Sequence, residues 1–389
     1  MTPNRKKLRV LLVLHELSHS GAPKLVLDLF DDLTDDVDVW CVSVLSGPLA
    51  GRCRKLGNLN ILPRMPLGGP LAKRLGPVLT DVFVNLLRLL VTPLSIRIRR
   101  WQPDLIYLNS VWSAPVSIIL PLPDVPVLMH VHELDIGIRL AVRQYPNEVL
   151  RSPNHYIAVS DAVSQALQAG HGISQNKITT ILGAVPDKDV ISDVNSIKST
   201  TGNTMPFIVG GCGTSYWRKG VFLWLQVARD VVSRIGAEAV KFIWVGAADA
   251  DELIMCEESA RKLGVENNVQ FVATTAEPLT WFRQFDVFAM TSIEDPCPIV
   301  VLENMMLGTP VLCFRNGGGT IEEVGDTGVT VDNFSVTEMA DHVISLAHDS
   351  TRRHQMGLAA IDRVKLSFLV SIQSPKILVV MKGLIGTNK

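Results

Sequence analysis

Acidic residues follow directly on an apolar run in the part of the chain that ends at Glu323. The run closes at Met290 and predicts a buried strand, and Glu294 and Asp295 come almost at once after it. A carboxylate accepts hydrogen bonds from hydroxyl groups such as those of a ribose or a hexose, and it would repel a phosphate. These two acids therefore predict a site for hydroxyl groups, and the alternative is that they only cap the helix predicted after them.

A short helix and a glycine-rich loop are the elements that would hold these acids. Pro298 suits the first turn of a helix over residues 299–307, and Gly308 suits its end. The start of a helix presents unpaired N–H groups and a positive dipole end, which suit a phosphate. The glycines at 317–319 form a turn whose N–H groups can approach an anion. Carboxylates for hydroxyls beside amides for phosphate predict a sugar-nucleotide site where parallel strands end.

Arg218 and Lys219 lie at the end of a second glycine-rich turn, over residues 211–220, between a predicted strand and a predicted helix. A cation at the start of a helix lies at the unfavourable end of the helix dipole, so a purely structural role does not explain it. Such a cation can offset the charge that grows on a leaving diphosphate. We therefore expect Lys219 to share one site with the acids near residue 300.

The run from Glu294 to Val311, EDPCPIVVLENMMLGTPV, resembles the acidic signature of glycosyltransferase family 4, whose members are retaining enzymes of the GT-B fold. Two acids separated by seven residues mark that family. Asp295 and Glu303 have this separation, whereas eight residues separate Glu294 from Glu303, so the first acid stays open between Glu294 and Asp295. The resemblance implies that Glu303 holds ribose hydroxyls and that Glu294 or Asp295 binds the donor sugar.

The same resemblance extends to the residues that would face the diphosphate. Lys219 matches the lysine of the family's cation motif, which also has an arginine five residues earlier. Thr214 stands in the place of that arginine, so Arg218 is the candidate to take over its role. Backbone amides near Gly318 and in the first turn of the predicted helix would add to the binding of the diphosphate; the residues of that turn are Pro298, Ile299 and Val300.

In the first half of the chain, a predicted strand ends at His130, His132 and Glu133. The run HVHEL resembles the family's H-D or H-E at the floor of the cleft, and His132 matches the histidine that contacts the transferred sugar or polarises the acceptor. The alternative is a histidine satisfied by its neighbours at the end of a strand. These residues do not predict a zinc site, because no further ligand is apparent to complete one. The resemblance likewise implies no metal and no cofactor, since the nucleotide-sugar is a co-substrate.

Strand and helix patterns alternate along the 389 residues and predict an α/β protein with two doubly wound, Rossmann-like domains facing a cleft. The first domain, which would bind the acceptor, covers 1–188. A linker rich in Ser, Thr, Asn and Gly covers 189–206, and the domain that would bind the nucleotide-sugar covers 207–366. The tail, 367–389, would be a helix crossing back to the first domain.

The tail departs from the family pattern. Ser374 and Pro375 interrupt the expected amphipathic helix, and residues 377–381 look strand-like. Two interpretations stay open: the end of the chain is short and irregular, or the element that crosses back is altered.

Composition sets the class of the protein and of its partners. Hydrophobic residues make up 47% and charged residues 19%, which permits a sizeable core. The 37 basic and 38 acidic residues give a net charge of -1, so no basic excess points to nucleic acid. The six cysteines have no C-x-x-C spacing and predict reduced core residues of a cytoplasmic protein.

Residues 49–100 are basic and amphipathic, with ten arginines and lysines and one acid, Asp81. Such a stretch can lie on an anionic membrane surface, which would make the protein peripheral on the inner face of the membrane. The alternative is a helix that faces its own sheet and turns a solvated basic face outward. Residues 105–123 carry no charge, but Asn109 and several prolines and serines argue against a membrane span.

The resemblance implies transfer of a sugar, as by a hexosyltransferase, from a nucleotide-sugar to a hydroxyl of a glycan or a lipid-linked acceptor, with retained anomeric configuration. The alternative is a non-catalytic GT-B-like protein that binds a nucleotide-sugar or serves as a scaffold, since a fold does not fix a function. A dinucleotide oxidoreductase is disfavoured because no G-x-G-x-x-G follows the first strand.

Overall fold

The computed structural model describes residues 7–63, 70–114, 116–145, 149–150, 153–190, 206–214, 217–247 and 250–386. Of the predicted linker, only residues 189, 190 and 206 are among them, so the rest of that prediction lies outside the described residues. The chain forms two compact units, and each has its own sheet. Unit 1 comprises Met1–Leu182 and Val370–Lys389, and unit 2 comprises Gly183–Leu369.

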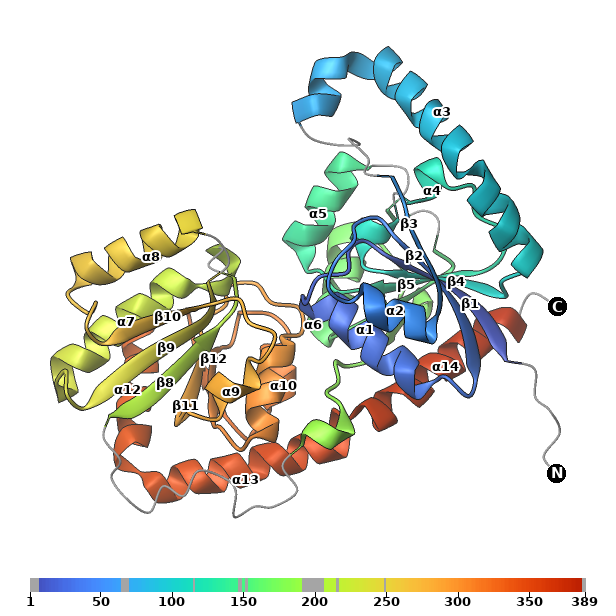
Figure 1. The fold of residues 1–389 in the computed structure, drawn as a ribbon. Coiled ribbons are helices and arrows are strands. Elements are labelled where there is room, and N and C mark those ends of the chain that lie inside the picture. Colours follow the sequence, from blue (N-terminus) through green and yellow to red (C-terminus); the bar gives the residue numbers. More distant parts are fainter. Residues whose placement is uncertain are drawn as a thin grey trace, which may run out of the picture. The chain divides into compact units, whose positions relative to one another are not determined.

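A seven-stranded parallel sheet forms the centre of unit 1, in the order β3-β2-β1-β4-β5-β6-β7 (Figure 1). Its strands are β1 (Leu8–Leu14), β2 (Val37–Ser43), β3 (Gly57–Ile61), β4 (Leu105–Asn109), β5 (Val127–Val131), β6 (His155–Ala158) and β7 (Ile178–Thr180). The order reverses between β1 and β4, where Leu14 pairs with Asn109. At such a switch point the connections leave in opposite directions, so this edge is the expected place for a ligand.

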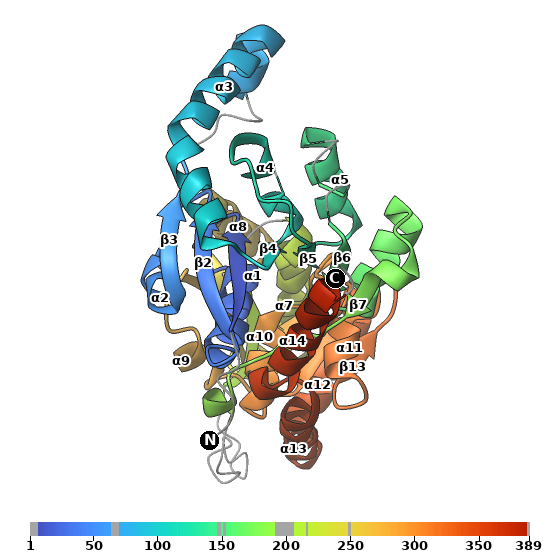
Figure 2. The ribbon, with the colours of Figure 1, turned by 90° about the vertical axis from the view of Figure 1, so that its right-hand side faces the viewer.

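Helices cover both faces of this sheet. They are α1 (Gly21–Asp32), α2 (Ala50–Leu56), α3 (Pro70–Trp101), α4 (Val116–Ile119), α5 (Asp135–Gln144), α6 (Asp161–Gln165) and α14 (Val370–Gly386). Short 3₁₀ helices at Val111–Ser113 and Gln175–Lys177 and a π-helical segment at Ala166–Gly170 complete the unit. The last helix comes from the far end of the chain and packs beside α1 (Figures 1 and 2).

The strand-like interpretation of residues 377–381 is wrong, because they belong to α14, which continues through Pro375. Ile377 and Met381 are four residues apart and fully buried, so a helix places both on the face that meets unit 1. Polar contacts also fix α14 to the end of α1 and to the loop that follows it. The Ser374 hydroxyl donates to Asp32, and Lys382 Nζ lies 3.0 Å from Asp36. Burial of this face outweighs the backbone hydrogen bond that Pro375 removes.

Unit 2 repeats the topology with six parallel strands in the order β10-β9-β8-β11-β12-β13. The strands are β8 (Phe207–Cys212), β9 (Val240–Ala247), β10 (Val269–Ala273), β11 (Val287–Met290), β12 (Val311–Phe314) and β13 (Val329–Val331). Its helices are α7 (Val221–Ile235), α8 (Ala250–Leu263), α9 (Leu279–Phe282), α10 (Ile299–Met306), α11 (Thr320–Val324), α12 (Val336–His348) and α13 (Ser350–Ser367). Short turns lie at Trp217–Lys219 and Asp187–Asp189. The switch point falls between β8 and β11, so the prediction of two doubly wound α/β domains is confirmed.

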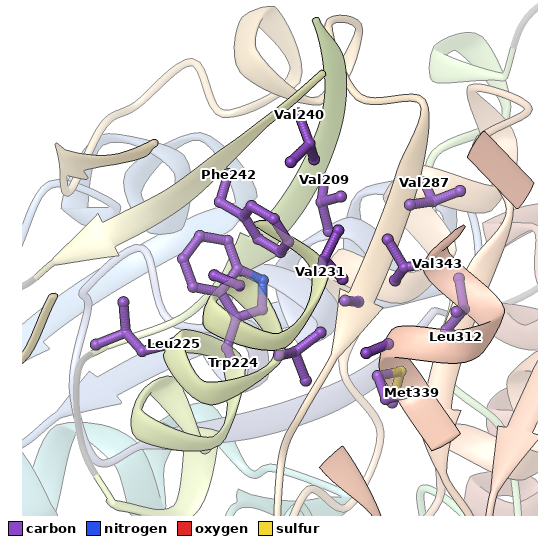
Figure 3. Packing of buried hydrophobic residues seen from close by; sticks show 14 of the residues in the cluster. Val209, Trp224, Leu225, Val231, Val240, Phe242, Val287, Leu312, Met339 and Val343 are labelled. Carbon is purple, nitrogen blue, oxygen red and sulfur yellow. The ribbon is translucent and has the colours of Figure 1, made fainter. Parts of the chain in front are cut away.

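The core of unit 2 forms where α7 and α12 pack on one face of the sheet (Figure 3). Trp224 on α7 meets Phe242 edge to face, with ring centroids 5.2 Å apart. Its indole N–H and that of Trp244 also reach the backbone of β8 and the turn after it, at Gly210 O (3.4 Å) and Gly213 O (2.9 Å). The aromatic core therefore fixes the strand that leads into the predicted site.

Three strands were not predicted: β3, β7 and β13. Each lies at an edge of its sheet and has five or fewer residues. Edge strands bury less of their surface, so their sequences lack the continuous apolar run that identifies a central parallel strand. The uncharged stretch 105–123 forms β4, a short turn and α4, and within the described ranges no helix is long and apolar enough to cross a membrane.

Trp224→Ala should reduce the free energy of unfolding by about 3–5 kcal/mol, because it leaves a cavity in a close-packed core. Phe222→Ala on the same helix is the control: that side chain is 41% exposed, and a surface change costs within about 0.5 kcal/mol. Urea unfolding followed by circular dichroism measures both. Equal losses in the two variants would contradict this account of the core.

Candidate functional site

Two loops meet at the switch point of unit 2, one after β8 and one after β11. The Ile293 N–H donates to Arg218 O at 2.8 Å, and the Thr291 hydroxyl donates to Gly220 O at 3.0 Å. Gly220 has φ +69, and a Cβ there would lie 1.9 Å from Thr291 O. Only glycine combines this left-handed conformation with so close an approach.

A buried ion pair lies between these loops. Lys219 Nζ is 2.5 Å from Asp295 Oδ2, and the two side chains are 13% and 4% exposed. The Ser292 hydroxyl lies 3.4 Å and Arg218 Nη1 3.9 Å from the same oxygen. Gly213 makes room for the lysine, since a Cβ there would be 2.9 Å from the Lys219 stem. The structure thus holds a cation at the place where the sequence predicted one, with an acid as its counter-ion.

The backbone of Asp295 joins this pair to the glycine-rich loop after β12. Its N–H donates to Gly317 O at 2.7 Å, and Gly319 N–H donates to its carbonyl at 2.9 Å, which makes a parallel bridge opposite Gly318. Gly318 has φ +113, a conformation that favours glycine. The loops after β8, β11 and β12 are therefore held at one edge of the sheet.

The helix α10 begins directly after this bridge. Pro298 is its N-cap, and Ile299 and Val300 form the first turn, whose N–H groups point beyond the helix end as in any α-helix. Glu303 follows one turn later and is buried, at 4% exposed. Arg218, Lys219, Glu294, Asp295 and Gly318 are thus brought together at one edge, and the remaining predicted residues of this unit lie on the helix that starts there.

Glu323 follows the glycine-rich loop at 317–319, and sequence reasoning missed its hydrogen-bond partner. Glu323 is 1% exposed, and its Oε1 accepts a hydrogen bond from Cys297 Sγ at 3.0 Å. Burial raises the pKa of Glu323 well above its usual range, and the charge of Asp295 adds to this. Arg363 holds the short helix α11 in place by donating to the carbonyls of Glu322 and Glu323. The burial of Glu323 therefore favours its protonated form over the carboxylate.

His132 belongs to unit 1, where it directly follows β5 near the β1/β4 switch point. Its Nε2 lies 2.8 Å from Asn109 Oδ1, and Asn109 Nδ2 donates to Ala22 O at 3.1 Å. Because the amide NH₂ is already the donor toward Ala22, the oxygen must accept, so the network assigns the ring proton to Nε2 and a lone pair to Nδ1. Burial lowers the pKa of His132 well below its usual range, with His130 and His15 adding to the effect. His132 is thus a neutral hydrogen-bond acceptor.

His130 lies behind His132 and is fully enclosed. Its Nδ1 is 2.7 Å from the Tyr107 hydroxyl, and its Nε2 has no hydrogen-bond partner in the described part of the chain. Burial lowers the pKa of His130 to about 3. The His130 and His132 rings are 4.2 Å apart between centroids, so a charge on either would be unfavourable for the other.

Glu133 and Ser110 complete this polar edge, and sequence reasoning gave no role to Ser110 or Asn109. The Ser110 hydroxyl and the His132 N–H both donate to the Glu133 carboxylate. Ser110 has φ +86, a strained conformation for a residue other than glycine, where β4 ends. Among the described residues, no group of three or more His, Cys, Asp or Glu could hold a metal ion.

Gly220→Ala should destabilise the protein by clearly more than Gly236→Ala. Both glycines have positive φ, which costs an alanine about 1–2 kcal/mol, but a Cβ at Gly236 would meet nothing within 4 Å. The clash with Thr291 O adds to the cost only at Gly220. Chemical denaturation of the two variants measures the difference, and equal stabilities would show that the two loops do not meet in this way.

The buried histidine predicts a pH dependence of stability. Below its usual pKa of about 6.5, the unfolded chain takes up a proton on His130, while the folded chain does not until the pH falls to about 3. The free energy of unfolding that this group contributes is therefore present at neutral pH and falls by about 2 kcal/mol between pH 7 and pH 5. The stability advantage of the wild type over His130→Leu should shrink by this amount in urea unfolding at the two pH values. His354→Leu, at an exposed histidine of α13, is the control, and parallel pH profiles for wild type and His130→Leu would contradict the assignment.

Models of known protein families match parts of both units. A family model described as Glycosyltransferase Family 4 matches residues 21–188, and one described as Glycosyl transferases group 1 matches residues 206–349. The D-inositol 3-phosphate glycosyltransferase of Corynebacterium diphtheriae is 31% identical over 152 residues, 37% of this chain and 35% of that protein. That of Kribbella flavida is 33% identical over 111 residues, 28% of this chain and 26% of that protein. In both, the matched segment covers less than half of the relative.

Solved structures agree in fold. HepE of Anabaena, in complex with UDP and glucose, has a TM-score of 0.71 at 20% identity and covers 97% of this chain and 100% of its own. WaaG, a glycosyltransferase involved in lipopolysaccharide biosynthesis, has a TM-score of 0.72 at 14% identity, with 97% and 100% covered. Sucrose-phosphate synthase from Thermosynechococcus elongatus reaches 0.75 at 16% identity, with 98% and 100% covered. These likenesses show the GT-B fold with its two Rossmann-like domains. Since two family models match the elements from α1 to α12, this chain belongs to glycosyltransferase family 4.

Proposed function

We propose that this protein is a retaining glycosyltransferase, which moves a sugar from a nucleotide-sugar to a hydroxyl of a glycan or a lipid-linked acceptor. The observation that carries the proposal is the buried Lys219–Asp295 pair at the β8/β11 switch point, beside the Gly318 loop and the start of α10. The family membership and the UDP and glucose held by HepE support a nucleotide-sugar donor.

Charge at the pair suits a diphosphate. Lys219 and Arg218 both approach Asp295 Oδ2, so the three groups together carry one net positive charge. A diphosphate would bring further negative charge, and both Lys219 and Arg218 would be attracted to it. Arg218 is 40% exposed and can turn toward the ligand, which makes it the substitute for the arginine that Thr214 replaces. Backbone N–H groups near Gly318 and in the first turn of α10 would complete the contacts.

The carboxylates would hold hydroxyl groups. In this proposal Glu303, which seven residues separate from Asp295, accepts from the ribose hydroxyls. Asp295 offers Oδ1 to the donor sugar while its Oδ2 stays with Lys219, and we favour it over Glu294 because the ion pair already fixes its position. As the glycosidic bond breaks, Lys219 and Arg218 offset the charge that grows on the leaving diphosphate.

His132 would serve the acceptor or the transferred sugar. Its Nδ1 lone pair can accept a hydrogen bond from a hydroxyl, since Asn109 fixes the proton on Nε2 and burial keeps the ring neutral. The proposal uses no metal and no cofactor. We place the protein in the cytoplasm and at the inner face of the membrane, where a lipid-linked acceptor would be found.

A thermal-shift screen with UDP, GDP and ADP sugars would identify the donor, because a ligand held by the folded state at about 100 times its Kd adds about 2.7 kcal/mol of stability. The variant Lys219→Met should then lower transfer by about 100-fold or more, as expected on losing one group that stabilises charge in the transition state. The control Lys241→Met removes an exposed lysine of β9 and should leave transfer unchanged.

Lys219→Met alone leaves Asp295 buried without its counter-ion, so it could fail to fold. The double variant Lys219→Met/Asp295→Asn removes both charges and should keep a melting temperature near that of the wild type while transfer stays lost. Transfer retained in the folded double variant would contradict the proposal. Wild-type protein that binds a donor and neither transfers nor hydrolyses it would instead be a non-catalytic member of the family.

A further inference from the structure

The helix α3 is apolar on two opposite sides. The side toward the rest of unit 1 is buried and carries residues at helical spacing: Val84, Leu87, Val91 and Ile98, at 8% exposed or less. Figures 1 and 2 show the helix running along unit 1 and extending past the strands of the sheet. This inner side accounts for the packing of α3 on its own unit.

The opposite side is apolar as well, and it faces outward. We name it the outward stripe; its residues are Val82 (51% exposed), Leu86 (54%), Leu89 (70%), Leu90 (70%) and Ile96 (45%). At 3.6 residues per turn, these positions fall on the side of the helix away from the buried one. Sequence reasoning had offered a solvated basic face as the alternative to membrane contact, and the stripe shows that this face is not simply basic.

Cations border the outward stripe, and acids are absent from it. Residues 82–103 contain four arginines and neither Asp nor Glu. Arg88 and Arg99 lie to one side, tied to the carbonyls of Ile118 (2.8 Å) and Leu122 (3.0 Å). Arg97 lies over the Trp40 ring, 5.5 Å from its centroid, at the end of the helix where Arg100 also stands. An apolar stripe with arginines at its margin is the pattern of a helix that lies in the interface of a bilayer.

We propose that the outward stripe of α3 docks this protein on an anionic lipid bilayer. The apolar side chains would enter the boundary of the acyl chains while the arginines meet anionic headgroups. The inference deepens the proposed function, on which it rests for its biological purpose, because it would bring the protein to a lipid-linked acceptor.

A second copy of the chain fits the stripe less well than a bilayer does. Two stripes in contact would bring arginines together, and the stretch offers no acid to pair with them. Five side chains also bury far less than the roughly 800 Å² per partner of a stable protein interface. Charge complementarity therefore favours anionic headgroups.

The test is flotation of the full chain with vesicles at low salt, one set containing phosphatidylglycerol and phosphatidylcholine and the other phosphatidylcholine alone. The wild type should float with the anionic vesicles and stay below with the neutral ones. Leu89→Glu/Leu90→Glu should lower the bound fraction at least about tenfold, since two exposed leucines no longer enter the bilayer. Ile254→Glu/Met255→Glu alters a matched exposed pair on α8, at 62% and 55% exposed, and should bind as the wild type does.

Two outcomes would overturn the inference: wild-type protein that stays below with anionic vesicles, or a Leu89→Glu/Leu90→Glu variant that floats as well as the wild type. A dimer in solution that this variant dissociates would show that a second copy covers the stripe instead. Donor hydrolysis measured without vesicles separates the two proposals, because it should be equal in wild type and variant. Wild-type protein that floats normally but does not hydrolyse the donor would count against the proposed function alone.

Discussion

The Lys219–Asp295 ion pair is the interaction on which unit 2 depends. Taking two charges out of water is costly, and their attraction repays that cost only with good geometry and further polar contacts. Here the contacts come from Ser292, from Arg218 and from the backbone bridge at Gly318. The pair therefore requires that three loops from three strands end at the same place, which a parallel sheet with a switch point provides.

The aromatic core behind the site also helps to keep the ends of these strands in place. Trp224 and Trp244 hold the backbone at Gly210 and Gly213, so the strand that leads to Lys219 cannot shift without breaking core contacts. In unit 1, the histidines at the equivalent edge are neutral: burial keeps His130 and His132 uncharged, and Asn109 sets the tautomer of His132. One topology thus carries different chemistry, a buried ion pair where we place an anionic donor and neutral histidines where we place a hydroxyl acceptor.

The central strands and the charged residues near Lys219 could be predicted because both produce local patterns in the sequence. β1, β8 and β11 are continuous apolar runs, and the acids and glycines follow them at fixed spacing. The Cys297–Glu323 and Asn109–His132 contacts join residues 26 and 23 positions apart, and no periodicity in the sequence predicts such a pair. The helix α14 was obscured by Pro375, because its stability comes from burial against α1, a partner more than 300 residues away in sequence.

A helix that is apolar on two sides needs a partner for each. The inner side of α3 has unit 1, and its outward stripe has arginines at the margin and no acids, which an anionic bilayer matches. The stripe belongs to the unit that carries His132, whereas the ion pair belongs to the other. A nucleotide-sugar is a water-soluble anion and needs fixed charges, while a lipid-linked acceptor stays in the headgroup layer and has to be approached there. The division of polarity between the two units would match the two substrates that we propose.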